Sequence, residues 1–193
     1  MNIKLFKNLE IVGAFFLFGL ATLLHFVYEL TNGSVFSILF GAVNESVWEN
    51  TKIFLVAYSV WAIVELLVSN VHFKRFVVSK VIGVYFLCAF IICMHYIVSL
   101  FTDKPIIWAD IAIGIIGVIL AQFISYKLTV GSSNIQLYFI PSLFLLGLFF
   151  IGLFSFTVFP PHLEVFRDEQ TGFFGIIPKY IDRGAAVLNS NFT

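Results

Sequence analysis

The sequence places a few histidines, carboxylates and one lysine inside or beside long apolar runs. An ionisable side chain is costly in a membrane unless it is paired or hydrated, so each one is a functional candidate. The candidates are His25, Glu29, Glu45, Glu49, Lys52, Glu65, His95, Asp110, His162 and Asp168. Histidine nitrogens and carboxylate oxygens form the ligand set of catalytic zinc sites, and they are also common acid–base groups.

The spacing of these residues divides them into groups. His25 and Glu29 are four residues apart and share a helix face, and a simple hydrogen-bonded pair at the helix end is the competing interpretation for them. Glu45, Glu49 and Lys52 also share one face if their helix begins before Glu45. Several helices could bring these faces together into one pocket. Interfacial charge that touches water is the competing interpretation for Glu45 and Lys52.

Structural roles compete with function for the other candidates. Ser46-x-x-Glu49 fits a capping box, in which the two side chains satisfy backbone N–H groups at a helix start. A packed pair between helices would explain His95 and Asp110, which have apolar residues on both sides. His162, after two prolines, fits a solvated loop residue.

Five apolar runs must position these residues. A bilayer core of about 30 Å requires about 20 apolar residues per helix. The predicted spans are 11–30, 47–68, 77–101, 106–128 and 137–159. The composition agrees, with 60% hydrophobic and 11% charged residues, whereas a soluble domain is about 25% charged. The sequence therefore predicts an all-α integral membrane bundle of about five transmembrane helices.

Two further segments accompany the spans. Residues 35–43 are apolar but too short to cross a bilayer, which predicts a re-entrant or interfacial helix. After the bundle (1–159), residues 160–193 form a second unit, an extracytoplasmic tail packed over the outer mouth. Within it, short apolar pieces at 163–166 and 173–177 flank turn residues and predict a small hairpin. Residues 184–193 read as a loose end.

Basic residues in short loops predict the orientation in the membrane. Lys4 and Lys7 precede the first span, and Lys74 and Arg75 follow the second. This pattern indicates a multi-pass plasma-membrane protein with a cytoplasmic N-terminus and an extracytoplasmic C-terminus. Most candidates then lie at the outer leaflet, while Glu65 would reach from the inner side toward His72, Lys74 and Arg75.

Charge and cysteine content exclude two classes of protein. Eleven basic and eleven acidic residues give a net charge of zero, so the basic face of a nucleic-acid-binding protein is missing. Cys88 and Cys93 lie within one apolar run and cannot form a disulfide framework. The bilayer is the expected partner, with a lipid headgroup or small molecule as ligand; the oligomeric state is left open.

The stretch 44–52, Asn-Glu-Ser-Val-Trp-Glu-Asn-Thr-Lys, resembles the N-E-S-x-W-E-[HN]-x-K signature of an uncharacterised family of small bacterial membrane proteins. The resemblance extends to His25 and Glu29 and to the tail. The matching tail residues are Pro160, Pro161, Phe166, Asp168, Thr171, Gly172, Phe174 and Gly175. Asn50 stands where the signature also allows histidine. The resemblance implies no activity.

Three functions remain open, and the sequence does not decide whether the chain is an enzyme. The first is a metal-dependent hydrolase acting on a lipid or lipid-linked substrate, with a divalent metal such as zinc. Its predicted metal ligands are His25, Glu29, His95 and His162; its predicted catalytic residues are Glu45, Glu49 and Asp110. Asn44, Ser46, Lys52 and Asp168 would complete the polar pocket. The alternatives are a transporter of ions or small solutes and a non-enzymatic accessory or sensor protein with a structural polar cluster.

Overall fold

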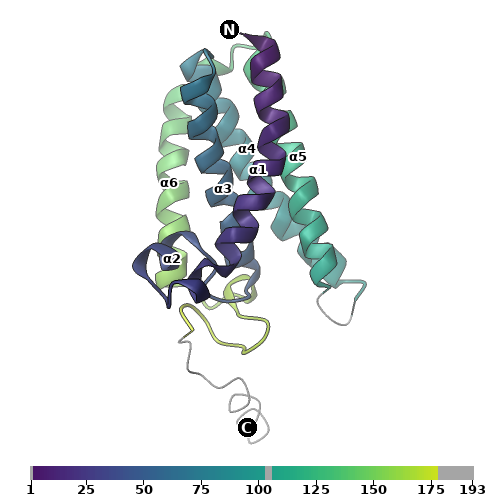
Figure 1. Cartoon of the computed structure of the whole chain (residues 1–193), viewed down its shortest axis with the longest axis vertical. Helices are drawn as coiled ribbons and strands as arrows, with labels where there is room; N and C mark the ends of the chain where they lie inside the picture. The colour runs from purple at the N-terminus through teal and green to yellow at the C-terminus, as the bar shows by residue number, and fades with distance from the viewer. Residues whose placement is uncertain (1, 103–105, 178–193) are drawn as a thin grey trace, which may run out of the picture.

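Five long helices make up the body of the protein. The computed structural model describes residues 2–102 and 106–177. Within these residues the long helices are α1 (Ile3–Leu30), α3 (Val47–Val68), α4 (Phe73–Ser99), α5 (Ile107–Val130) and α6 (Phe139–Val158) (Figure 1). All five are long and apolar enough to cross a membrane, the last together with residues 135–138. The prediction of an all-α fold with five helices that could span a membrane is therefore confirmed for the described residues.

The helices pack so that four of them enclose a common interior. α4 packs against α3, α5 and α6, while α1 packs against α3 and α5. Leu17, Leu55 and Leu87 are fully buried in the resulting core. Figure 1 shows α1 and α5 diverging toward the end of the bundle where α2 lies. A cavity lined by residues of α1, α3, α4 and α5 lies in this part of the bundle.

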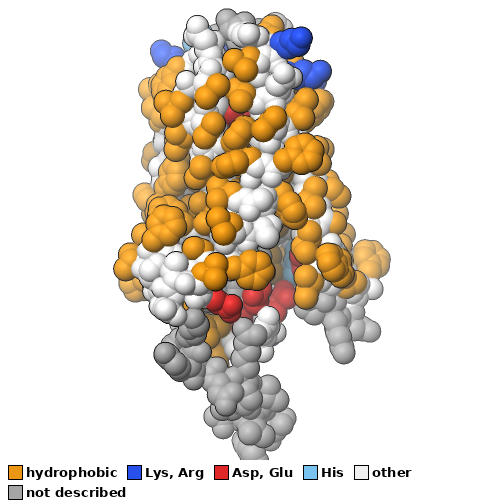
Figure 2. All heavy atoms as spheres, in the orientation of Figure 1, with side chains coloured by type: hydrophobic (Ala, Val, Ile, Leu, Met, Phe, Trp, Pro, Cys, Tyr) orange, Lys and Arg blue, Asp and Glu red, His pale blue; other side chains and the backbone are white. Residues whose placement is uncertain are grey.

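The outer surface of the bundle is apolar. Phe15, Leu67 and Ile140 each keep more than 70% of their surface exposed. In Figure 2, hydrophobic side chains cover the visible face along most of its length, with Lys and Arg at one end and Asp and Glu gathered at the other. Such a surface is stable against lipid tails, so the apolar band fits a bilayer.

A short helix, α2 (Val35–Phe40), links α1 to α3. The Ser34 side chain caps its start by accepting a hydrogen bond from the Ser37 backbone N–H. The predicted short helix over 35–43 is present but ends earlier, at Phe40, with Gly41 as its C-cap. Gly41 lies against α1, where a Cβ would meet Val27 and the Leu24 carbonyl oxygen. Residues 41–46 are therefore a loop before α3.

The chain after α6 folds back over the end of the bundle that holds α2 (Figure 1). Residues Glu164–Phe166 form a 3-10 turn, and one antiparallel bridge joins Arg167 to Phe174. The predicted turn is present, but the predicted apolar strands are absent from the described part of the tail. The reason is local: the 3-10 turn replaces an extended strand over Glu164–Phe166, and the Phe166 ring packs on Trp48. The predicted loose end at 184–193 lies outside the described residues.

Candidate functional site

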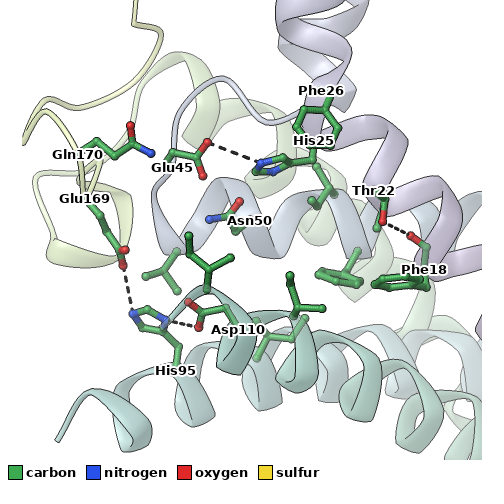
Figure 3. Close-up of a pocket in the computed structure, with 17 residues that line it drawn as sticks. Phe18, Thr22, His25, Phe26, Glu45, Asn50, His95, Asp110, Glu169 and Gln170 are labelled. Carbon is green, nitrogen blue, oxygen red and sulfur yellow. Dashed lines mark hydrogen bonds and ion pairs between the residues drawn. The ribbon is translucent and has the colours of Figure 1, made fainter. Parts of the chain in front are cut away.

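A cavity of about 450 Å³ lies where α1 and α5 diverge. Six parts of the chain contribute to it: α1, the loop before α3, the start of α3, α4, α5 and the tail. Six polar residues of the lining could bind a ligand or transfer a proton, and they are together named the cavity site. They are His25, Glu45, Asn50, His95, Asp110 and Glu169. Figure 3 shows these side chains arranged around the open space.

The walls of the cavity are mainly apolar. Phe18 and Phe26 line it from α1, and Phe54 lines it from α3. Isoleucines of α3, α4 and α5 complete the wall at positions 53, 91, 107 and 111. Polar groups are concentrated at the mouth and apolar groups along the sides. A space of this kind suits a ligand with one polar and one apolar end.

His95 is held between two carboxylates. Its Nδ1 lies 2.8 Å from Asp110 Oδ1, and its Nε2 lies 3.3 Å from Glu169 Oε1 (Figure 3). The three residues come from α4, α5 and the tail. A carboxylate on one ring nitrogen fixes the orientation of an imidazole, as in a general base. The predicted pairing of His95 with Asp110 is present, and Glu169 is an addition that the sequence did not indicate.

His25 faces Glu45 across the cavity mouth. His25 Nε2 lies 3.7 Å from Glu45 Oε1, too far for a direct hydrogen bond. Glu45 would share a helix face with Glu49 and Lys52 only if the helix began before Glu45, and this condition is not met because α3 begins at Val47. Glu45 therefore lies in the preceding loop and points toward the cavity (Figure 3).

The tail is fixed to this loop by Asp168. Its Oδ1 accepts a hydrogen bond from the Glu45 backbone N–H at 2.7 Å. Its Oδ2 accepts bonds from the Thr171 backbone N–H at 2.7 Å and from the Thr171 hydroxyl at 2.6 Å. Nearby, Asn44 Nδ2 donates to the Gly175 carbonyl oxygen at 2.8 Å. Asp168 is thus a buried anchor that places its neighbour Glu169 on His95.

Glu49 and Lys52 form a separate cluster on another face of α3. Lys52 Nζ lies 2.6 Å from Glu49 Oε2 and donates to the Thr157 hydroxyl at 2.8 Å. Glu49 also accepts bonds from the Thr157 hydroxyl and from the Val43 backbone N–H. All of these side chains are buried between α3 and α6. The structure therefore separates Glu49 and Lys52 from the cavity, although both are candidates by sequence.

Ser46 accounts for half of the expected capping box. Its hydroxyl oxygen accepts a hydrogen bond from the Glu49 backbone N–H at 3.2 Å. The Ser46 N–H, however, is bonded to Asn44 Oδ1 instead of to the Glu49 side chain. Ser46 therefore caps α3, and Asn44 shapes the loop that holds Glu45.

The four predicted metal ligands do not come together. His25 and His95 line the cavity, whereas Glu29 lies one turn farther along α1 and is absent from its lining. His162 stacks on Phe174 in the tail, with 4.8 Å between ring centroids. Across residues 2–102 and 106–177, no three His, Cys, Asp or Glu side chains are arranged to hold a metal ion. The described residues thus give the predicted zinc site no support.

A second polar group, named the Lys80 network, is buried near the opposite end of the same four helices. Lys80 Nζ lies 3.2 Å from Glu10 Oε2, forms an ion pair with Glu65, and donates to Gln122 Oε1 at 3.1 Å. The Ser125 hydroxyl donates to Glu10 at 3.0 Å, and Trp61 Nε1 donates to Glu65 at 3.0 Å. The prediction that Glu65 reaches toward His72, Lys74 and Arg75 is wrong, because Lys80 is a closer, buried partner.

Sequence reasoning missed three acidic or amide residues. Glu10 precedes the predicted start of the first span, which the structure moves back to Ile3. Glu169 stands in a tail whose acidic residues looked like ordinary turn residues. Asn50 follows Glu49 in the signature and points into the cavity (Figure 3). The signature was the one signal that could have identified Asn50.

Residues 1–176 match the family model of DUF6512, described as a family of unknown function. The chain belongs to this family, so the predicted membership of an uncharacterised family is confirmed. No curated protein and no solved structure matches the chain.

Proposed function

We propose that this DUF6512 protein binds a membrane amphiphile in the cavity, with the polar head at the cavity site and the alkyl chain along the apolar walls. The observation that carries the proposal is the cavity itself, about 450 Å³ with aromatic and aliphatic walls and two histidine–carboxylate pairs at its mouth. Few, well-placed polar groups in an apolar pocket are typical of small-molecule sites.

The position of the cavity gives such a ligand a route of entry. α1 and α5 both carry exposed apolar side chains and both line the cavity, and the two helices diverge toward the end that holds α2 (Figure 1). Figure 2 shows acidic and histidine side chains in a recess on this face, next to hydrophobic ones. A lipid could therefore enter sideways from the bilayer without leaving it completely. Its head would lie at the level of the histidines.

Photolabelling of the protein in nanodiscs tests this proposal. A dodecyl probe with a diazirine group would be activated by light and the labelled peptides mapped by mass spectrometry. We expect label to concentrate on peptides of α1 and α5 that line the cavity. Replacing Ala21, a buried lining residue, with Phe should reduce that label about tenfold by filling the space.

Gly19→Phe is the matched control. Nothing lies within 4 Å of a Cβ at Gly19, so the same bulk on the same helix should leave labelling unchanged. Thr22→Phe is a second lining variant in case Ala21→Phe does not fold. Label spread evenly over lipid-facing peptides, and unaffected by Thr22→Phe, would overturn the proposal.

Hydrolysis of a bound ester is a second candidate, favoured by the 2.8 Å contact between His95 and Asp110. In this scheme, water attacks the ester carbonyl carbon while His95 Nε2 accepts the water proton. The C–O bond to the alcohol then breaks, and the proton passes from His95 to the leaving alkoxide. Glu169 occupies Nε2 in the structure, so this contact must open first.

Release of nitrophenol from nitrophenyl laurate would measure this activity. Removing a general base costs about 10²–10⁴-fold in rate, so His95→Gln should lose that much while still binding the photoprobe. Glu164→Gln, in the tail but outside the cavity lining, is the control. Equal turnover by wild type and His95→Gln would reject hydrolysis by His95.

Transport receives less support than binding. Leu17, Leu87 and Val118 are buried between the cavity site and the Lys80 network. An ion would have to cross this apolar layer. A structural role, in contrast, suits the Lys80 network and the Glu49–Lys52 cluster, whose charged groups are paired inside the protein.

We also propose that the cavity faces the extracytoplasmic side of the plasma membrane. Lys4 and Lys7 stand at the start of α1 and Lys74 at the start of α4. Figure 2 shows Lys and Arg side chains at the opposite end of the bundle from the gathered Asp and Glu side chains, which matches the bias of cytoplasmic loops toward basic residues. In a background with both native cysteines replaced by Ser, Glu164→Cys should react with an impermeant maleimide on intact cells, and Lys74→Cys should not. The reverse pattern would invert the topology.

A further inference from the structure

We propose that the amphiphile bound in the cavity carries a cationic, amine-type head. This inference rests on the proposed function and names the chemical class of its ligand. The apolar walls of the cavity could accept the alkyl chain of many amphiphiles. The charged residues at its mouth select among them by the charge of the head group.

The charge at the mouth is negative for every protonation state of the histidines. Glu45, Asp110 and Glu169 supply three carboxylates, and His25 and His95 are the other ionisable residues of the lining. With both imidazoles protonated the ionised carboxylates leave a charge of −1, and with both neutral the charge is −3. Like charges repel strongly where water is scarce. A phosphate or carboxylate head is therefore disfavoured.

Basic residues do not offset this charge within the described lining, which contains neither Lys nor Arg. Arg167 lies in the same tail segment as Glu169, but its Nε is 3.2 Å from Glu164 Oε2 and its side chain is half exposed. Lys52, the basic residue closest in sequence to Asn50, is buried with Glu49 on another face of α3. The ionisable groups that face a ligand in the cavity are therefore carboxylates, which accept hydrogen bonds, and imidazoles.

The geometry suits an ammonium group that donates N–H bonds. Glu45 and Glu169 approach the mouth from the loop and the tail, and Asp110 approaches from α5, so acceptors surround the space from different sides (Figure 3). An ammonium could replace His95 as the partner of Glu169, which is 3.3 Å away. The rings of Phe18, Phe26 and Phe54 line the adjoining wall, and aromatic faces also attract cations.

Competition against the photoprobe tests the inference. Dodecylamine, dodecyl glucoside and dodecyl phosphate share one alkyl chain and differ in head charge. Each would be titrated against cavity labelling in zwitterionic nanodiscs, with empty nanodiscs used to correct for partition into the bilayer. We expect dodecylamine to protect the cavity at a concentration at least tenfold below the neutral compound, and the phosphate to protect least.

Two variants assign the preference to the carboxylates. Glu169→Gln should weaken protection by dodecylamine about tenfold and leave protection by dodecyl glucoside unchanged. Asp110→Asn should act in the same direction. Glu164→Gln removes an equal charge from the same tail segment outside the cavity and should change neither compound.

The outcomes separate this inference from the proposed function. Failure of all three compounds to protect the cavity would overturn both. Equal protection by all three, or stronger protection by the glucoside or the phosphate, would overturn the cationic head and leave amphiphile binding standing. An amine preference that survives Glu169→Gln and Asp110→Asn unchanged would also reject the inference, because it would not arise from these groups.

Discussion

The cavity site and the Lys80 network both take residues from α1, α3, α4 and α5, yet one lines open space and the other is packed. The cavity site also takes Glu45 from a loop and Glu169 from the tail. Residues 10 and 25 of α1, 50 and 65 of α3, 80 and 95 of α4, and 110 and 125 of α5 each lie 15 positions apart. At about 1.5 Å per residue, the two polar layers are separated by roughly 22 Å along the helices.

Side-chain size and helix separation explain the difference. At the Lys80 network the helices are close: a Cβ at Gly13 would collide with Trp61 and Gln122, and one at Gly83 would collide with the Tyr58 hydroxyl. At the cavity site α1 and α5 have diverged. Charged residues within a membrane protein therefore do not mark a ligand site by their presence alone. A ligand site is indicated instead by unfilled space beside the charged residues.

The largest expected effect that would test this contrast is that of Lys80→Met. The substitution leaves the Glu10 and Glu65 carboxylates buried without their cation, and breaking a buried ion pair costs about 3–5 kcal/mol. We expect thermal unfolding in detergent to shift accordingly. Lys127→Met removes the same charge from an exposed position of α5 and should change stability by less than about 0.5 kcal/mol. Similar losses for both would mean that the network does not hold the helices.

Asp168→Ala should have the next largest effect, on the tail. The side chain accepts three hydrogen bonds, and a bond to a charged group contributes about 1.5–3 kcal/mol. Hydrogen exchange should rise by tenfold or more at the Glu45 and Thr171 amides while the amides of α4 stay protected. Unchanged exchange at both positions would show that Asp168 does not anchor the tail.

Thr157→Val tests the Glu49–Lys52 cluster. Its hydroxyl accepts from Lys52 and donates to Glu49, and valine keeps its shape without the oxygen. We expect a loss of about 1–3 kcal/mol in unfolding free energy, since two buried charged groups each lose a partner. Thr22→Val, whose hydroxyl bonds only to its own helix at Phe18, is the matched control. A larger loss for Thr22→Val would contradict the assignment.

Asp110→Asn should have the smallest effect on stability. Because Asp110 and His95 are both partly exposed, we expect a change below about 1 kcal/mol, with amphiphile binding affected instead. The same measurement of thermal unfolding in detergent that is used for Lys80→Met makes the comparison direct. A loss as large as that of Lys80→Met would make the cavity site a structural element like the network.

Apolar periodicity and length predicted the helices well, because the bilayer requires long runs that are visible in the sequence. The grouping of site residues was only partly predictable. Counting positions along the predicted spans placed His25, His95 and Asp110 at the same end of the bundle, and all three line the cavity. The position of Glu45 was not predictable in this way, since helix spacing does not apply to a residue in a loop.

Contacts between distant segments were not predictable from one sequence. Glu169 reaches His95 only because Asp168 docks on the backbone of Glu45, and neither spacing nor composition encodes that docking. The partner of Glu65 was also not predictable. Lys80 lies on α4, the next helix in the chain, but α4 carries other basic residues as well. Which of them pairs is decided by packing.

The anchoring of the tail has a consequence for when the site comes into existence during synthesis. Asp168 and Glu169 follow all five long helices in the chain, and they close a contact with a loop that precedes the second of those helices. The five helices can insert and assemble before the tail is synthesised. His95 can form its ion pair with Glu169 only after the tail has been made. The mouth of the cavity is therefore completed last, after the membrane-embedded part is in place.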